Sequence, residues 1–308
     1  MNAENNRTLL IAFGANLGVA ASKFAAAAVT GSSAMLTEGV HSVVDSLNQL
    51  LLIWGRRQAR KAPDPVHPFG YGRELYFWSF VVAVLVFALG AGVSVYEGVI
   101  HILDPEPAVS PLIAYGVLLA AFLLEGWSTL AAFREFRAAK GPLGWWEAVR
   151  RSKDPPGFIV LLENGAAMAG LIAAALGLFL AQVTGNPVFD GAASIVIGII
   201  LGLTAWLLAV ESKALLIGEA AEPELVEGLR AIAAGRPGIA GVGQILTLHS
   251  APDQITALMS VDFDDAIAAR EVERIVCTIE AEVARLWPQV KRLYIRPLQG
   301  AGEEEGPA

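Results

Sequence analysis

A stripe of polar residues interrupts one long apolar segment of the sequence. Residues 34–54 include the strongly polar side chains Glu38, His41, Asp45 and Asn48, at steps of three, four and three. On an α-helix of about 3.6 residues per turn, this spacing places all four on one face. A histidine and an aspartate four residues apart can bind one metal ion from a single helix. His41 and Asp45 are therefore candidate metal ligands, and Glu38 is a third candidate on the same face.

The alternative interpretation of His41 and Asp45 is a buried pair that joins helices by hydrogen bonds. Glu38 argues against it, because a third ionisable group within a bilayer is costly unless it has a function. A nitrogen and a carboxylate oxygen suit Zn²⁺, and less selectively Mn²⁺, Fe²⁺, Co²⁺ or Ni²⁺. A tetrahedral site needs two more ligands from elsewhere in the chain.

A second apolar segment, residues 157–182, offers those ligands. Glu163 and Asn164 are the strongly polar residues of its first half. Glu163 would supply charge and Asn164 a weaker amide oxygen, although a pair of interhelical hydrogen bonds is an equal alternative. Among the other carboxylates, Glu125 lies deep in its segment, and we expect it to pair with Lys23.

A loop at residues 64–74 contains two further candidate ligands, Asp64 and His67, between glycine turns. Taken alone this motif is weak. Glu74, which opens the next apolar segment, also fits a plain contact with the positive end of a helix dipole.

The composition is that of a polytopic membrane protein. The 308 residues are 55% hydrophobic and 17% charged, and a soluble domain has no use for several apolar runs of this length. Six spans are predicted, at residues 8–29, 34–54, 75–99, 109–133, 157–182 and 188–216. The net charge of −8 gives no sign of a nucleic-acid partner, and the single cysteine, Cys277, excludes an intramolecular disulfide.

The loops between these spans alternate in charge. Lysine and arginine gather in residues 55–74 and 134–157, and are absent from residues 30–33, 100–108 and 183–187. The positive-inside rule then places both basic loops and both termini in the cytoplasm. We read the second basic loop, with its paired tryptophans, as an interfacial segment at the headgroups.

After residue 218 the sequence becomes that of a small soluble domain. A helix over 222–234, strands over 245–249 and 255–263, a helix within 266–287 and a strand over 293–295 are predicted. This order suggests a compact α+β sandwich. The domains are expected to be 1–217 in the membrane, 218–298 in the cytoplasm and a disordered tail over 299–308.

The sequence resembles the cation diffusion facilitator family of divalent-metal/proton antiporters. Residues 31–45 resemble the family's second-helix signature, and residues 67–74 resemble its His-Pro-aromatic-Gly-His-Gly-basic-x-Glu loop. The resemblance implies that His41 and Asp45 bind the transported ion. It also implies six spans with both termini inside, a ferredoxin-like cytoplasmic domain and a homodimer.

The sequence departs from the family pattern on the fifth helix, where a His or Asp and an Asp four apart are usual. Those positions fall on Val160 and Asn164 here, with Glu163 beside them. Tyr71 stands where a metal-binding histidine is common, and the C-terminal domain keeps only His249. Residues 152–155 and 161–164 resemble a divergent branch that includes the mitochondrial zinc transporter.

These observations predict a divalent cation exporter, with Zn²⁺ as the expected ion, that exchanges metal for protons by alternating access. His41, Asp45, Glu163 and Asn164 are the expected ligands, no resident cofactor is expected, and no enzymatic site is seen. The rival hypothesis is a membrane scaffold or metal sensor with a degenerate transport site. The expected location is the inner or plasma membrane of a prokaryote.

Overall fold

The computed structural model of the protein describes residues 3–105 and 111–298, so the predicted tail over 299–308 lies outside the described residues. The chain divides into two units. The first comprises Met1–Gln58 and Glu74–Lys213, and the second comprises Ala59–Arg73 and Ala214–Ala308.

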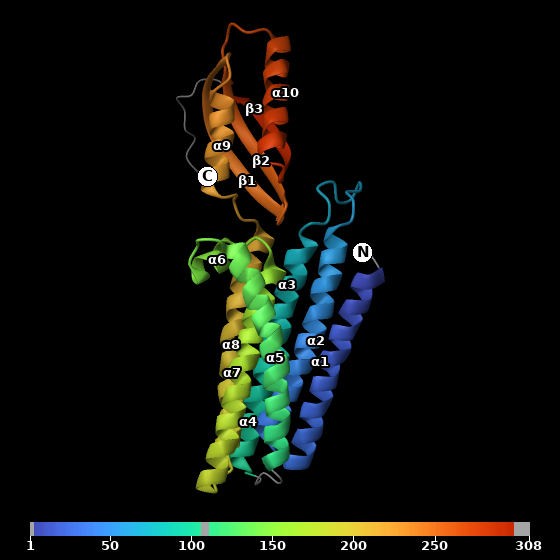
Figure 1. Cartoon of the computed structure of the whole chain (residues 1–308). Coiled ribbons are helices and arrows are strands. Elements are labelled where there is room, and N and C mark those ends of the chain that lie inside the picture. Colours follow the sequence, from blue (N-terminus) through green and yellow to red (C-terminus); the bar gives the residue numbers. More distant parts are fainter. Residues whose placement is uncertain (1–2, 106–110, 299–308) are drawn as a thin grey trace. The chain divides into compact units, whose positions relative to one another are not determined.

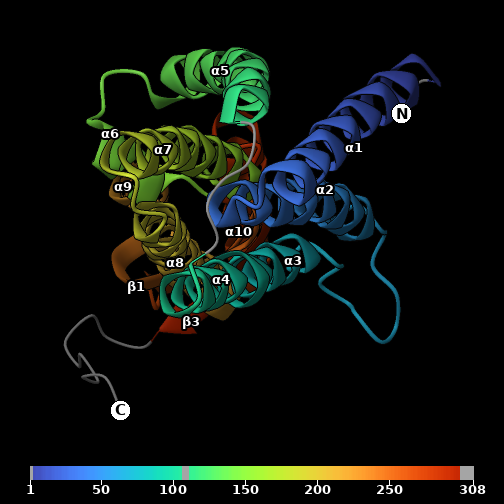
Figure 2. The same ribbon diagram turned by 90° about the horizontal axis from the view of Figure 1, so that it is seen from below.

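The first unit is a bundle of long helices (Figure 1). In chain order they are α1 (Ala3–Thr30), α2 (Ser33–Ala59), α3 (Glu74–Leu85), the π-helical turn η1 (Val86–Ala91), α4 (Gly92–Leu103), α5 (Pro111–Lys140), α6 (Trp145–Arg151), α7 (Pro155–Thr184) and α8 (Val188–Ile217). Figure 2 looks along the bundle and shows α5 lying beside α7, and α1 beside α2.

Several helix boundaries have causes that the sequence contains. Gly31 adopts a left-handed φ of 69° between α1 and α2, a conformation that glycine adopts without a Cβ penalty. α7 begins at Pro155, where the proline pair at 155 and 156 prevents the helix from extending backwards. The predicted third span is helical over 74–103, but a π-helical turn interrupts it at η1, which periodicity did not indicate.

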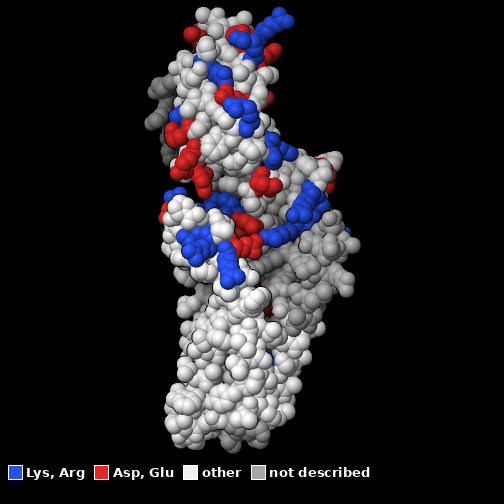
Figure 3. Space-filling model, in the orientation of Figure 1, with Lys and Arg blue, Asp and Glu red and all other residues white. Residues whose placement is uncertain are grey.

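Within the described residues, four helices are long and apolar enough to cross a membrane: Glu74–Leu103, Leu112–Lys140, Pro155–Thr184 and Val188–Ile217. The predicted number of six is therefore not confirmed by length and composition. α2 is long, but it carries the polar stripe. On the face drawn in Figure 3, the helical unit shows almost no charged side chains along most of its length.

Asp190, near the start of α8, caps the N-terminus of α2. Its carboxylate accepts hydrogen bonds from the backbone N–H groups of Ser33 at 2.6 Å and Ala34 at 3.3 Å, and from the hydroxyl of Ser32 at 2.8 Å. Asp190 is only 2% exposed. These N–H groups have no partner inside their own helix, and an anion is favoured at this end of the dipole. Asp190 thus fixes the start of the helix that carries the polar stripe.

Glycines allow α4 and α8 to approach closely. A Cβ built on Gly98 would lie 2.6 Å from the carbonyl oxygen of Gly191 and 2.9 Å from the backbone nitrogen of Ile195. A Cβ on Gly198 would lie 3.0 Å from the backbone nitrogen of Val95. Because these neighbours are backbone atoms, the helices could not keep this spacing with larger residues. Small residues at such contacts are typical of membrane helix pairs.

The second unit contains α9 (Pro223–Ala234), β1 (Ile239–Ala251), β2 (Gln254–Phe263), α10 (Ala269–Leu286) and β3 (Val290–Leu298). The sheet order is β1-β2-β3, with β1 antiparallel and β3 parallel to β2. This is the predicted αββαβ order. β1 begins six residues earlier than expected, because register shifts among its glycines hide the alternation that marks a strand.

The helices of this unit cover one face of the sheet. Alternate residues of β2, namely Ile255, Ala257, Met259 and Val261, are buried against α9 and α10. On the opposite face, Leu246 and Tyr294 pair with Leu258 across the three strands, and all three are exposed. The sheet thus carries an apolar outer stripe, defined here as Leu246, Leu258 and Tyr294.

Replacement of Gly98 by valine should separate α4 from α8. The added side chain meets backbone atoms that cannot rotate away, so we expect a loss of about 1–3 kcal/mol of stability. The measurement is the midpoint of thermal unfolding in detergent. Gly116→Val is the matched control, because a Cβ on Gly116 of α5 would meet nothing within 4 Å. Equal midpoints for the two variants would contradict the close α4–α8 contact.

Candidate cation-binding cavity

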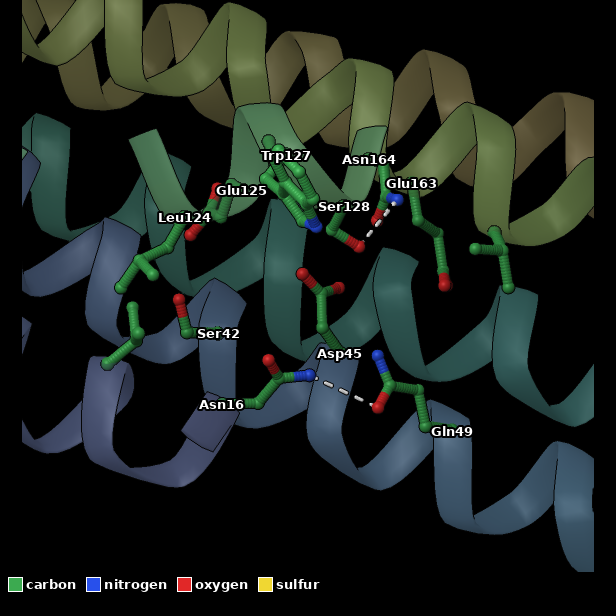
Figure 4. Close-up of a pocket in the computed structure, with 13 residues that line it drawn as sticks. Asn16, Ser42, Asp45, Gln49, Leu124, Glu125, Trp127, Ser128, Glu163 and Asn164 are labelled. Atoms are coloured by element: carbon green, nitrogen blue, oxygen red, sulfur yellow. Dashed lines mark hydrogen bonds between the residues drawn. The ribbon is translucent and has the colours of Figure 1, made fainter. Parts of the chain in front are cut away.

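The helical unit contains a cavity of about 320 Å³ between α1, α2, α5 and α7 (Figure 4). Asp45, Glu125 and Glu163 bring a carboxylate to its wall from three different helices. The remaining lining residues are Asn16, Val19, Ser42, Gln49, Leu124, Trp127, Ser128, Val160, Asn164 and Ala167. A cavity with this many oxygen-bearing side chains inside an apolar bundle has the chemistry of a cation site.

Asp45 extends into the open space from α2 (Figure 4). One of its oxygens lies 3.5 Å from Nδ1 of His41, one helical turn earlier. His41 is 1% exposed, and within the described part of the chain neither of its ring nitrogens has a hydrogen-bond partner. One buried oxygen of Asp45 also lacks a partner there. Unpaired buried polar atoms cost about 1–3 kcal/mol each, so the pair suits a ligand that would satisfy them.

Glu163 and Asn164 reach the cavity from α7 and are each held by one neighbour. Nδ2 of Asn48 donates to Glu163 at 2.7 Å, which ties α7 to the polar stripe of α2. Nδ2 of Asn164 donates to the hydroxyl of Ser128 on α5 at 3.3 Å. With its nitrogen engaged in this way, Asn164 has its amide oxygen available for an ion. Val160 lines the same wall but has no ligand atom.

A fully buried lysine lies at the side of the cavity. The ammonium of Lys23 donates to Glu38 at 2.9 Å, to Ser42 at 2.9 Å and to Glu125 at 2.7 Å. The predicted pairing of Lys23 with Glu125 is confirmed. Glu38 is completely buried, and it does not line the cavity. A Cβ on Gly170 would contact Oε1 of Glu38, so the glycine makes room for this carboxylate.

The loop candidates Asp64 and His67 belong to the second unit and make a compact local structure. Asp64 accepts hydrogen bonds from the backbone N–H groups of Val66 at 2.9 Å and His67 at 2.6 Å, and from the hydroxyl of Tyr71 at 2.6 Å. The Tyr71 hydroxyl, followed by the His67 N–H, lowers the pKa of the Asp64 carboxyl below its ordinary value of 3.8. Tyr71, which stands where the family commonly has histidine, thus fixes the loop through a hydrogen bond.

The same loop packs against the sheet of its unit. The guanidinium of Arg292 on β3 donates to the carbonyl of Pro68 at 2.5 Å and lies 4.5 Å from the ring centre of Phe69. A Cβ on Gly72 would contact the backbone of Ser250. These contacts hold the loop without a metal ion. Nothing in the local sequence indicated that residues 59–73 would group with the C-terminal domain.

The structure brings only some of the predicted ligands together. Asp45, Glu163 and Asn164 face one cavity, and His41 adjoins Asp45. Among the residues described, no three His, Cys, Asp or Glu side chains converge on one point where an ion could bind. Sequence reasoning did not place Glu125 in this cavity, although its depth in an apolar segment was a usable signal.

The chain matches the cation efflux transmembrane domain family over residues 9–217. It is 35% identical to the proton-coupled zinc antiporter SLC30A9, mitochondrial, of Xenopus laevis over 244 residues, which are 78% of this chain and 44% of that protein. It is 36% identical to metal tolerance protein C4 of Arabidopsis thaliana over 223 residues, 72% of this chain and 49% of the relative. The magnetosome protein MamB of Magnetospira sp. QH-2 is 24% identical over 280 residues, with 88% and 89% covered. The chain spans less than half the length of the first two relatives.

Replacement of Tyr71 by phenylalanine should raise the pKa of Asp64 towards 3.8. In the wild type the lowered pKa means that the loop gains stability that is fully present above pH 3.8 and is lost as the pH falls through the lowered value. Carbon-13 NMR of aspartate-labelled protein in detergent, with the signal assigned through Asp64→Asn, gives the pKa directly. An unchanged Asp64 pKa in Tyr71→Phe would contradict the hydrogen bond.

Proposed function

The chain belongs to the cation efflux family of membrane transporters, and we propose that it exports divalent cations, Zn²⁺ foremost, in exchange for protons. Membership of this family, together with the four long apolar helices, makes it a multi-pass membrane protein and a transporter rather than an enzyme. The names of relatives support zinc and protons, since they include a proton-coupled zinc antiporter and a metal tolerance protein. The scaffold hypothesis has no such support.

The observation that carries this proposal is the cavity bounded by Asp45 of α2 and Glu163 of α7, with His41 beside Asp45. We propose these three groups as the ligands of the transported ion, with Asn164 as a supporting or coordinating oxygen. A nitrogen and carboxylate oxygens suit Zn²⁺, and less selectively Mn²⁺, Fe²⁺, Co²⁺ and Ni²⁺. The ion is the cargo, and we propose no resident cofactor.

Charge balance suggests how the exchange works. Two carboxylates and a neutral histidine balance a divalent ion, which an apolar environment favours. Metal binding requires these groups to lose protons, so protons on the opposite side of the membrane compete with the metal for the same groups. The ligands line one cavity without converging, so movement of α2 relative to α7 would complete the site. Alternating access of the cavity to the two sides then gives net export.

We further propose that α1 and α2 also cross the membrane, which gives six crossings with both termini in the cytoplasm. The lysine and arginine excess of the loops at 55–74 and 134–157 supports this orientation. We retain the domain division at residues 217 and 218, and the inner or plasma membrane of a prokaryote as the location. Mitochondria are the competing location, because animal relatives are named mitochondrial.

We propose a homodimer that forms through the apolar outer stripe of the sheet. Three neighbouring exposed large side chains on one sheet face are a typical interaction surface. We propose that this interface forms without metal, because the outer stripe consists of apolar and aromatic side chains.

Asp45→Asn and Glu163→Gln should each lower zinc uptake into proteoliposomes by at least about 10- to 100-fold, because even residues that only support metal ligands contribute on that scale. Each variant removes one of the two charges that face the ion but keeps the side-chain volume. Asn164→Ala should weaken uptake less, because it removes a neutral oxygen. Metal-dependent proton movement is recorded in the same vesicles.

The matched control is Asp104→Asn, an acidic residue after α4 that does not line the cavity. Normal transport by Glu163→Gln combined with inactive Asn164→Ala would show that the family's fifth-helix position, and not Glu163, binds the ion. Wild-type vesicles that move no divalent ion of the panel Zn²⁺, Mn²⁺, Fe²⁺, Co²⁺ and Ni²⁺ would overturn the proposed function.

Leu258→Glu should dissociate the dimer, because it places a charge at the centre of the outer stripe. A central interface residue typically contributes enough that the dissociation constant rises by about tenfold or more. Light scattering of the full chain in detergent gives the mass. Leu286→Glu, at an exposed position on α10 away from that face, is the control. A wild-type dimer that becomes a monomer when chelator is added would contradict a metal-independent interface.

A further inference from the structure

Glu125 is a carboxylate in the cavity wall for which the proposed mechanism has no role. It belongs to α5, which none of the proposed ligands occupies. Figure 4 shows it on the opposite side of the open space from Asp45, with Ser128 of the same helix on the same wall. Three carboxylates from three helices thus surround one space.

The two oxygens of Glu125 have different environments. Oε1 accepts the hydrogen bond from Lys23 at 2.7 Å. Oε2 is buried, and it has no hydrogen-bond partner in the part of the chain that the structure describes. If Glu125 served only to neutralise Lys23, both of its oxygens could be hydrogen-bonded to protein groups. One oxygen of this cavity-lining residue is thus anchored by Lys23, and the other is left without a protein partner among the described residues.

Lys23 is well placed to control the position of Glu125. The three N–H bonds of an ammonium allow three donations, and Lys23 uses them on Glu38, Ser42 and Glu125. Ser42 and Glu125 line the cavity, whereas Lys23 and Glu38 do not. The lysine therefore holds two wall residues from behind, and it joins α1 and α2 to α5. Its positive charge also offsets the repulsion that an additional carboxylate would exert on Asp45.

Building on the proposed function, we propose that Glu125 is a further cation-contacting residue of this cavity, and that Lys23 is the residue that positions it. Val160 leaves α7 with one ligand position that cannot bind metal. Glu125 supplies a carboxylate oxygen to the same space from the neighbouring helix. The ion is then held by oxygens of Asp45, Glu163 and Glu125, with His41 beside them.

Glu125→Gln tests the contact, because the amide oxygen can still accept from Lys23 while the charge is lost. Calorimetry with zinc chloride on the full chain in detergent should give a dissociation constant about tenfold or more above that of the wild type. Glu97→Gln, which removes a carboxylate from α4 outside the cavity, should leave the dissociation constant unchanged. Glu125→Asp, which keeps the charge, should restore part of the affinity.

A double-mutant cycle tests the positioning role of Lys23. Lys23→Met should weaken zinc binding in the wild-type background, but it should have little further effect in the Glu125→Gln background, because the lysine acts through Glu125. A purely structural role for the lysine predicts equal losses in both backgrounds. That result would overturn the positioning role.

A measurement on the unmodified chain covers the case in which these variants do not fold. A hydrophobic carbodiimide labels membrane carboxyl groups, and mass spectrometry identifies the labelled residue. Zinc should protect Glu125 from the reagent and should leave the labelling of Glu97 unchanged. Equal labelling of Glu125 with and without zinc would overturn the inference. So would wild-type zinc binding that Glu125→Gln does not alter. A wild-type chain that binds no zinc would overturn the proposed function, and the inference with it.

Discussion

The burial of charge in an apolar bundle is the constraint on which this structure depends. No water is available in a bilayer to solvate a charged side chain, so each one must find its partners on neighbouring helices. The ammonium of Lys23 is completely buried and has three acceptors on α2 and α5. Removal of Lys23 would leave the buried carboxylate of Glu38 without its counter-charge, which costs several kcal/mol. The cluster therefore fixes three helices relative to one another at the side of the cavity.

Two other polar contacts join α2 to neighbouring helices. Asp190 of α8 caps its first turn, and Asn48 donates to Glu163 of α7 further along the same helix. α2 is thus bonded directly to α7, and it is linked to Glu125 of α5 through Lys23 of α1. A shift of α2 would therefore change the cavity wall as a whole. This arrangement suits a transporter, in which one movement must change access to the site.

The sequence was sufficient to predict the features that depend on local chemistry. The turn at Gly31, the start of α7 at Pro155 and the polar stripe follow from backbone preference and helical period. The αββαβ order of the second unit followed from period as well. Features that depend on which helix lies opposite were not predictable. Periodicity shows which face Asp190 and Glu125 occupy, but it does not show that one caps α2 and the other joins the cavity.

The departure of α7 from the family pattern does not remove negative charge from the cavity wall. Val160 removes a ligand from the usual position, yet Glu163 of the same helix and Glu125 of α5 both bring a carboxylate to the cavity that Val160 lines. The affinity of a site for a divalent cation depends on the number, charge and distance of the oxygens around the ion. The register of a helix affects the affinity only by changing where those oxygens lie. A site can therefore keep its net charge while its ligands change helix, provided that a counter-charge positions each new carboxylate. Lys23, 2.7 Å from Glu125, meets that condition.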